Sequence, residues 1–441
     1  MPDADSVTQA LFRPLRLNGV EIKNRIVLGP MAVLQPRQDG RPSEQTIAFL
    51  AERARGGAGL VIVGGGAGTR RMYEEGPYHP LLRLDLDEYV PDLKRLTDAI
   101  HAHDTPIFSE VMGGFGGMGR PGPGRPPIAA SPIGVTMRAD RFLTGVRIPG
   151  DRVLPTPQEA TIEEVRASER GTIAAALRMR RAGFDGVEIG AHMSYFHASF
   201  LSPRTNWRAD EYGGSAENRA RVLVNIVRGI RAEAGPDYPV GLRLSVNDHV
   251  EDGQGPEGFA EIAAIVAREG LAYVALTDGN YEAMHVNAPA VDGAMLEHGE
   301  PQVFRKAVGD LPLFLGNINS PVAAAAAIEA GHGDAIMLAR QLLADPKYPN
   351  KVRDGRLEDI TWCLRDNACM RRLLLNMPVR CHENPRMGRE SRAAGSLPPA
   401  GRILRRLAEE VVLKVSSSDR LMDLAARRAA RKAARQAPAA S

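Results

Sequence analysis

An imidazole and a phenol follow one apolar strand at a spacing that could serve proton transfer. Glu188 falls inside the predicted strand Gly186–Gly190, and His192 and Tyr195 come just past its end. Side chains of these two types beyond a strand can hydrogen-bond a carbonyl and deliver a proton. The alternative is that both are packed side chains with satisfied hydrogen bonds. Their position past the strand favours a chemical role.

A charged residue also lies in the middle of the apolar strand Val240–Ser245. Arg243 stands between Leu242 and Leu244, and burying a guanidinium is unfavourable unless it is paired. The charge could neutralise negative charge near N1 and O2 of a reduced flavin. A structural salt bridge inside the fold is the alternative.

Two turns made of small residues each lead into a predicted helix. Gly316 and Asn317 precede Ser320 and Pro321, and Ala339 and Arg340 precede a helix that starts at Gln341. Backbone N–H groups at such helix starts suit a phosphate, and a guanidinium can add a charge-assisted hydrogen bond. Ordinary turns are the alternative.

The cysteines are few and clustered. Cys363, Cys369 and Cys381 fall within 19 residues, and the chain has no others. An odd number of clustered cysteines, in a sequence that shows no signal-peptide features, predicts a metal or redox site rather than a disulfide framework.

The elements that must position these residues alternate between short apolar strands and longer helical patterns. Parallel neighbours require helical crossovers, so eight such strands predict a (β/α)8 barrel, with function at the C-terminal strand ends. A doubly wound open sheet is the competing fold. The predicted strands are Ile26–Met31, Leu60–Gly64, Pro106–Met112, Gly186–Gly190, Val240–Ser245, Tyr273–Thr277, Leu313–Gly316 and Ala335–Leu338. The predicted helices include Ser43–Arg55, Ala216–Ala234, Pro256–Arg268, Pro321–Ala330 and Gln341–Arg353, with Ser43, Ser215 and Ser320 at N-cap positions.

The barrel is expected to occupy residues 1–355. The Gly- and Pro-rich stretch Gly113–Pro155 predicts a loop or small hairpin over the strand ends. A cysteine-containing extension, 356–400, and a basic helical tail, 401–441, are expected to follow.

Charge and hydropathy exclude several classes of protein. The formal net charge is +3, but residues 401–441 hold 10 basic against 4 acidic residues, which leaves 46 against 49 in the body. A nearly neutral body argues against nucleic-acid binding. The sequence shows neither signal-peptide features nor an apolar run long enough for a membrane span. A cytoplasmic enzyme acting on a small molecule, and forming a homo-oligomer, is expected.

The sequence resembles the old yellow enzyme family of FMN oxidoreductases, and more narrowly the branch with 2,4-dienoyl-CoA reductase and trimethylamine dehydrogenase. The motifs run from Leu11 to about Glu390. They are LFRPLRLNGVEIKNRIVLGPM, RARGGAGLVIV, GFDGVEIGAH, FLSPRTNWRADEYGGSAENR, VGLRLS, LPLFLGNINSP and GDAIMLARQLLADPKYPNK.

The resemblance implies a barrel with FMN at the strand ends, and it assigns roles to individual residues. Arg243 would lie at the flavin pyrimidine, and Tyr195 matches the family's proton-donating tyrosine. The remaining cofactor residues would be Pro30, Met31 and Ala32 along the isoalloxazine, Gly64 beside it, and Gly316, Asn317, Ala339 and Arg340 at the phosphate.

Two departures from the family pattern concern the pocket. Glu110 stands where the family usually has a glutamine that bonds the flavin pyrimidine. Gly190 and Met193 replace a pair of polar residues that grips a carbonyl or phenolate in many members. The polar candidates around the substrate are therefore His192, Tyr195, Asp278 and Tyr281.

In the iron–sulfur branch of the family, four cysteines hold a [4Fe–4S] cluster. Here Cys363, Cys369 and Cys381 match three of them and Asp366 replaces the second. A carboxylate can ligate iron, and three thiolates alone would suit a [3Fe–4S] cluster. A decayed site with reduced thiols is the alternative.

The expected reaction is reduction of an activated C=C bond by hydride from flavin N5, with NAD(P)H as the electron donor. The sequence offers no dinucleotide fingerprint of the GxGxxG type, because the Gly-rich stretch near Gly113 follows a strand but does not open a helix. Nicotinamide would then stack on FMN directly, or electrons would come from a partner protein. Amine demethylation and an electron-relay subunit are the alternative functions.

Overall fold

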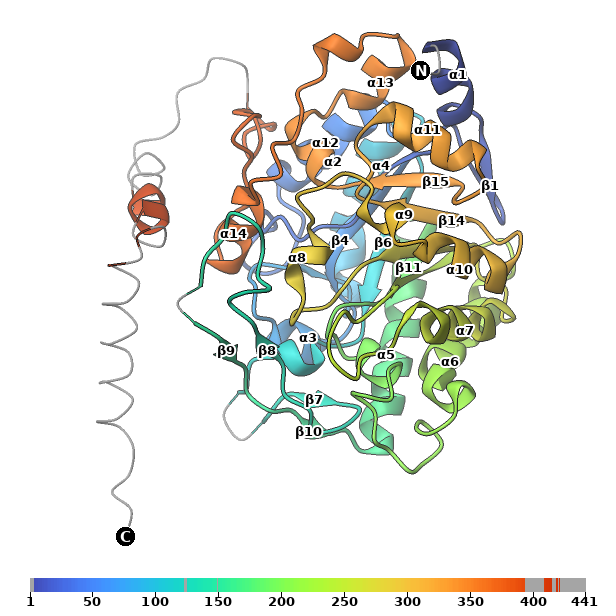
Figure 1. Ribbon diagram of the computed structural model, residues 1–441, viewed down its shortest axis with the longest axis vertical. Coiled ribbons are helices and arrows are strands. Elements are labelled where there is room, and N and C mark those ends of the chain that lie inside the picture. Colours follow the sequence, from blue (N-terminus) through green and yellow to red (C-terminus); the bar gives the residue numbers. More distant parts are fainter. Residues whose placement is uncertain are drawn as a thin grey trace.

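A sheet of parallel strands closes on itself at the centre of the molecule (Figure 1). The computed structural model describes residues 4–122, 125–148, 150–392, 408–414, 418 and 420. The ring runs through β3 (Ile26–Leu28), β4 (Leu60–Ala67), β6 (Ile107–Met112), β11 (Gly186–Ala191), β12 (Val240–Ser245), β13 (Tyr273–Thr277), β14 (Leu313–Gly316) and β15 (Ala335–Leu338). Pairing of β15 with β3, and of β3 with β4, closes it. The predicted (β/α)8 barrel is confirmed.

The strand limits agree closely with the sequence pattern, except around β3 and β4. β3 ends at Leu28, so Gly29, Pro30 and Met31 leave the sheet, while β4 continues to Ala67. The register of β4 against β6 shifts between Val63 and Gly66. A short strand, β5 (Leu82–Arg83), pairs with the end of β4 outside the ring.

Helices cover the outside of the barrel. The principal ones are α2 (Glu44–Arg55), α4 (Val90–His101), α5 (Ile162–Arg181), α6 (Ala216–Ala234), α7 (Pro256–Ala267), α10 (Glu300–Val308) and α11 (Pro321–Glu329). Ser43, Ser215 and Ser320 cap α2, α6 and α11 through their hydroxyl oxygens, as predicted. Shorter helices are α1 (Ala4–Leu11), α3 (Arg70–Glu75), α8 (Met284–Asn287) and α9 (Ala294–Glu297).

The single helix predicted for 341–353 is wrong. The chain instead forms α12 (Arg340–Ala344) and α13 (Tyr348–Arg353). Asp345 is followed by Pro346, and the residue before a proline is disfavoured in the helical region. Asp345 accordingly adopts an extended conformation, with φ −132° and ψ 95°.

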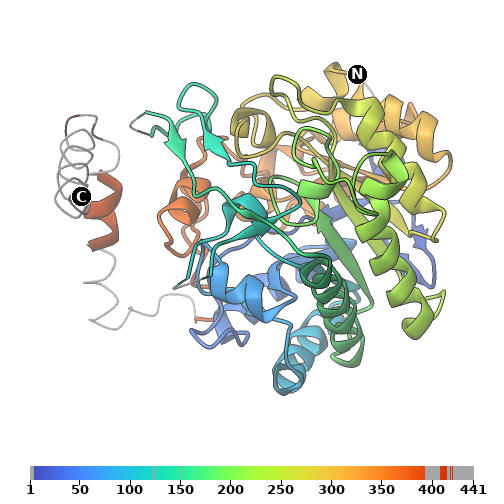
Figure 2. The ribbon, with the colours of Figure 1, turned by 90° about the horizontal axis from the view of Figure 1, so that it is seen from below.

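The Gly- and Pro-rich stretch forms small strands beside the mouth of the barrel (Figure 2). β8 (Thr136–Met137) and β9 (Arg152–Val153) make an antiparallel hairpin, and β7 (Ile128–Ala129) pairs with β10 (Gln158–Glu159). The loop or hairpin predicted for Gly113–Pro155 is thus confirmed. A further hairpin, β1 (Leu15–Leu17) with β2 (Val20–Ile22), precedes the barrel.

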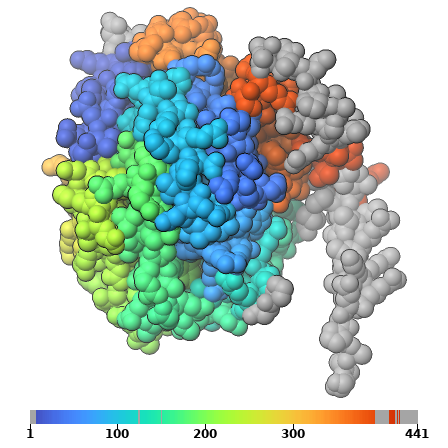
Figure 3. Space-filling model, turned by 180° about the vertical axis from the view of Figure 1, so that it is seen from behind, coloured from blue at the N-terminus to red at the C-terminus, as the bar shows by residue number. Residues whose placement is uncertain are grey.

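The segment after the barrel contains η4 (Leu357–Asp359) and α14 (Ala368–Leu374). Asn367 donates from Nδ2 to the carbonyl oxygen of Thr144, at 3.0 Å, which ties this segment to the loop between β8 and β9. Figure 3, seen from behind, shows the orange and red residues of this segment at one side of the barrel body. The helical tail predicted for 401–441 lies largely outside the described residues.

Aromatic side chains fill the barrel interior near the N-terminal ends of the strands. The rings of Tyr273 and Phe314 stack with centroids 4.2 Å apart, and Phe108 stacks on Tyr273 at 6.3 Å. This part of the barrel interior is therefore a packed core. None of the helices in the described parts of the chain has both the length and the apolar character needed to cross a membrane.

Candidate active site

A cavity lies at the C-terminal ends of the barrel strands. It encloses about 1240 Å³, counted to its open side, and residues at or just after all eight strands line it. Cofactor pockets of large size and mixed polar and apolar lining occur at this end of such barrels. The residues predicted to act from different strands therefore meet in one place.

Most of the predicted cofactor residues line this cavity. They are Pro30, Met31, Ala32, Glu110, Arg243, Gly316, Asn317, Ala339 and Arg340. Gly64 is the exception, because a Cβ at this position would lie 2.1 Å from the backbone nitrogen of Met31. Gly64 thus lets two backbones pack together, and its neighbour Gly65 lines the cavity. Sequence reasoning missed Gly65 because the register of β4 shifts between Val63 and Gly66, so that Gly65 lines the cavity in place of Gly64.

Arg243 is both paired and open to the cavity. Its Nε donates to Oε1 of Glu188 at 2.7 Å, and Oε1 of Glu110 lies 3.5 Å away. The hydroxyl of Tyr273 donates to the other oxygen of Glu188 at 3.0 Å. The flavin role and the structural salt bridge are therefore compatible, since Arg243 lines the cavity while it compensates a buried carboxylate.

Glu110 and His192 form a hydrogen-bonded pair in the cavity wall. Nε2 of His192 lies 3.3 Å from Oε1 of Glu110, and Nδ1 is buried without a hydrogen-bond partner among the described residues. Burial and the charge of Arg243 hold the pKa of His192 well below its usual value. The imidazole is therefore neutral, and Nδ1 is a polar atom for which a ligand could supply a partner.

Burial raises the pKa of Glu110 to about 7. The positive charge of Arg243 opposes this rise, and the negative charge of Glu188 adds to it. The folded protein thus holds a proton that the unfolded chain releases above a pH of about 4.5. The stabilisation from this group is full below that pH and is lost as pH rises through about 7.

We expect the free energy of unfolding to fall by up to about 3 kcal/mol across this pH window through Glu110 alone. Guanidinium denaturation across the window measures this change. The Glu110→Gln variant, which keeps the size but cannot ionise, should show a correspondingly flatter profile. Equal pH dependence in both proteins would contradict the assignment.

Three tyrosines form a hydrogen-bonded row along the cavity. The hydroxyls of Tyr195 and Tyr281 are 2.8 Å apart, and those of Tyr281 and Tyr78 are 3.5 Å apart. Burial raises the pKa of Tyr195 above its usual value, and it does the same for Tyr281 and Tyr78. All three phenols are therefore protonated near neutral pH. Sequence reasoning singled out Tyr195 and Tyr281 but missed Tyr78, which lies in an irregular segment with no motif.

The residues predicted to bind the FMN phosphate are arranged only partly as expected. Arg340 lines the cavity, and its Nη2 donates to Oδ1 of Asn317 at 3.2 Å. The N–H groups of Asn319 and Ser320, at the start of α11, donate to the carboxylate of Asp292 at 2.7 and 2.9 Å. The helix start is thus occupied by a protein carboxylate. The other residues predicted here, Gly316 and Ala339, line the cavity.

The structure places Asp278, a predicted substrate residue, beside the cavity-lining residue Thr277, and its contact with substrate stays a prediction. Asp278 is not among the residues that line the cavity, and its Oδ1 lies 2.7 Å from Nε2 of His249. Sequence reasoning also missed His249 and Glu300, which surround this carboxylate.

The three cysteines are free thiols outside the residues that line the cavity, and Cys363 and Cys369 lie within electrostatic range of Arg340. Burial raises the pKa of Cys369 to about 12; the Arg340 charge opposes the rise, and Cys363 and Cys381 add to it. The thiols therefore lie within electrostatic range of one another. Asp366, the predicted fourth ligand, instead accepts a hydrogen bond from His382 at 2.8 Å.

The cavity residues fit FMN. Small residues at Gly29, Gly65, Gly316 and Ala339 leave room at the strand ends, and the side chains of Arg243 and His192 line the space. A planar, anionic ligand would find both volume and complementary charge there. Among the residues predicted to ligate an iron–sulfur cluster, the three thiols influence one another electrostatically, whereas the carboxylate of Asp366 is hydrogen-bonded to His382.

Comparison with known proteins agrees with this geometry. A family model described as the NADH:flavin oxidoreductase / NADH oxidase family matches residues 10–359. NADH oxidase of Thermoanaerobacter brockii is 33% identical over 390 residues, which is 86% of this chain and 56% of that protein.

Two solved structures are similar over most of this chain. The complex of 2-naphthoyl-CoA reductase with 2-naphthoyl-CoA is 29% identical, with a TM-score of 0.77 over 89% of this chain and 59% of that chain. Histamine dehydrogenase from Rhizobium sp. 4-9 is 25% identical, with a TM-score of 0.74 over 87% and 53%.

This chain belongs to the NADH:flavin oxidoreductase / NADH oxidase family, which is the old yellow enzyme family. That membership places it in the class of FMN-dependent oxidoreductases, and the predicted family is confirmed. The chain spans little more than half the length of these relatives. Assignment to the narrower branch stays a prediction.

Proposed function

We propose that the protein reduces an activated C=C bond, such as that of an enone, a dienone or an enoyl thioester. The observation that carries this proposal is the Tyr195–Tyr281 hydroxyl pair, 2.8 Å apart, in a cavity that also holds His192 and Arg243. In the proposed reaction these groups would supply a proton donor, a carbonyl partner and a positive charge around one space.

When bound, FMN would supply a hydride from N5 to the β-carbon of the alkene. Pro30, Met31, Ala32 and Arg243 would hold it, with Gly316, Asn317, Ala339 and Arg340 at its phosphate. Tyr195 would then give its hydroxyl proton to the α-carbon. Tyr281 would return a proton to Tyr195 across their 2.8 Å contact, and a proton taken up from solvent would restore Tyr281. His192, which is neutral, would donate a hydrogen bond to the activating carbonyl. The reduced product thus gains one hydride and one proton.

Anaerobic flavin spectroscopy tests this proposal. The purified protein is reduced with NADPH or NADH and then mixed with enones, dienones and enoyl thioesters. We expect at least one of these three substrate classes to restore the absorption of the oxidised flavin, at a rate fast enough for catalytic turnover. Failure of all three classes to reoxidise the flavin would overturn the proposal.

Oxidation of an amine is the second candidate, and the likeness to histamine dehydrogenase favours it. In this direction the substrate would reduce the flavin without NAD(P)H. Bleaching of the oxidised flavin by methylated amines, with no response to activated alkenes, would select this candidate over alkene reduction.

We further propose that residues 356–400 form a module that holds an iron–sulfur cluster through Cys363, Cys369 and Cys381. We expect anaerobically purified protein to contain iron, and Cys369→Ser to lose most of it. Asp366→Ala should keep the iron if the thiolates alone are ligands, because Asp366 is hydrogen-bonded to His382. Iron analysis measures both variants, and absence of iron in the unmodified protein would show a decayed site.

A further inference from the structure

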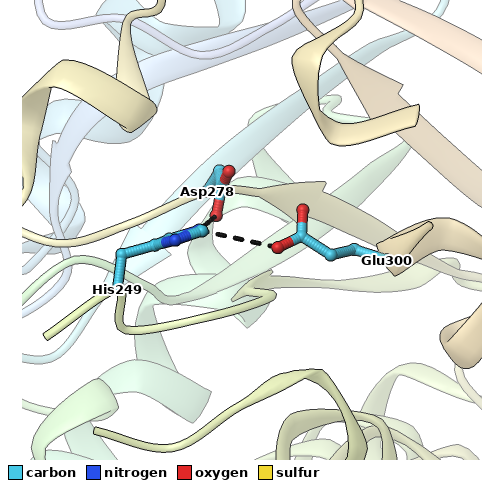
Figure 4. Close-up of side chains that lie close together, drawn as sticks. All are labelled: His249, Asp278 and Glu300. Carbon is cyan, nitrogen blue, oxygen red and sulfur yellow. Dashed lines mark hydrogen bonds and ion pairs between the residues drawn. The ribbon is translucent and has the colours of Figure 1, made fainter. Parts of the chain in front are cut away.

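A histidine and two carboxylates from three separate elements lie close together (Figure 4). His249 lies in the loop after β12, Asp278 directly follows β13, and Glu300 is the first residue of α10. Nε2 of His249 is 2.7 Å from Oδ1 of Asp278 and 3.5 Å from Oε1 of Glu300. We propose that these three side chains form a binding site for a divalent transition-metal ion, of which Zn²⁺ suits the donors best.

The donor set is the first argument. Imidazole nitrogen and carboxylate oxygen are common zinc ligands, and three protein ligands leave a fourth position for water. Ligand atoms about 2.1 Å from a tetrahedral ion lie roughly 3.4 Å apart. The contact between His249 and Glu300 already has this separation, at 3.5 Å. The contact between His249 and Asp278 would open by roughly 0.7 Å when a metal replaces the shared proton.

Charge and burial are the second argument. The side chains of Asp278 and Glu300 are 4% and 2% exposed, so two carboxylates are buried against one imidazole. Oε2 of Glu300 has no hydrogen-bond partner among the described residues, and its nearest ion-pair contact is Nδ1 of His298, 3.9 Å away. A buried carboxylate oxygen without a partner is unfavourable, and a divalent ion would supply the missing partner and charge.

The surroundings already orient the ligands. The N–H of Gly279 donates to Oδ1 of Asp278 at 2.9 Å, and Nδ2 of Asn247 donates to Oε1 of Glu300 at 3.3 Å. Such outer hydrogen bonds are typical of metal sites, where they fix the first ligands. Asp278 lies three positions before Tyr281. A metal ion here would therefore hold the β13 loop that carries Tyr281 against α10.

Calorimetric titration of the EDTA-treated, flavin-loaded protein with ZnCl₂ tests the proposal. We expect one Zn²⁺ per chain at this site and a rise in melting temperature on its addition. Glu300→Gln and His249→Ala should each weaken this binding at least about tenfold, since each removes one ligand. His249→Ala keeps the test valid if Glu300→Gln does not fold, because the side chain of His249 is 20% exposed.

Two matched controls separate this site from others. His285→Ala removes a nearby histidine outside the cluster, and it should bind Zn²⁺ as the unmodified protein does. The Cys363→Ser/Cys381→Ser variant removes thiols that also bind zinc, and the binding assigned here should persist in it. The proposal would be overturned if the unmodified protein bound no Zn²⁺. It would also be overturned if His249→Ala and Glu300→Gln bound Zn²⁺ as the unmodified protein does, or if only the loss of the thiols abolished Zn²⁺ binding.

Discussion

Tyr195→Phe is expected to lower the rate of alkene reduction by about 100- to 10,000-fold, the range in which a positioned general acid contributes. The Tyr195 hydroxyl lies in the cavity beside Tyr281, and burial keeps it protonated. Removing it takes away the proton donor but leaves the ring contacts with His192 and Phe115 in place. Reduction of the flavin by NAD(P)H should be unchanged, because that step requires no proton from Tyr195.

Stopped-flow measurement of the two half-reactions separates these effects. Tyr281→Phe should slow the alkene step less than Tyr195→Phe, since it removes the group that returns a proton to Tyr195 but leaves the proton donor itself in place. Tyr238→Phe is a matched control, because Tyr238 is buried outside the cavity and its hydroxyl has no hydrogen-bond partner among the described residues. An unchanged alkene step in Tyr195→Phe would assign the proton to another group.

Arg243→Met is expected to damage both stability and flavin binding. Glu188 is fully buried and depends on Arg243 for charge compensation. Removing one partner of a buried ion pair lowers the free energy of unfolding by about 3–5 kcal/mol. Loss of a charge-assisted hydrogen bond to the flavin, about 1.5–3 kcal/mol, would weaken FMN binding by roughly 10- to 100-fold.

The double variant Arg243→Met/Glu188→Gln separates the two consequences. It removes both members of the pair, so most of the lost stability should return, while FMN binding should stay weak. Guanidinium denaturation and FMN titration of the apoprotein measure these quantities independently. Normal FMN affinity in the double variant would show that Arg243 is a structural partner of Glu188 and not a flavin ligand.

The sequence alone determined the barrel and the place of its chemistry. Short apolar runs separated by helical patterns require parallel strands, and four of the eight strands have the predicted limits, including Val240–Ser245 and Ala335–Leu338. In a closed parallel barrel, every residue just past a strand lies at the same mouth. Local sequence therefore sufficed to bring His192, Tyr195, Arg243 and Gly316 to one cavity.

Only the tertiary structure decided which side chains face one another at that mouth. Tyr281 turns toward Tyr195, while Asp278, three residues earlier, is hydrogen-bonded to His249. Asp292 reaches the start of α11, where the sequence predicted a free phosphate site. These contacts join residues far apart in the chain through loops whose paths no local pattern specifies. The protonation of Glu110 is likewise a property of its burial, because desolvation depends on everything packed around the carboxyl group and not on its neighbours in sequence.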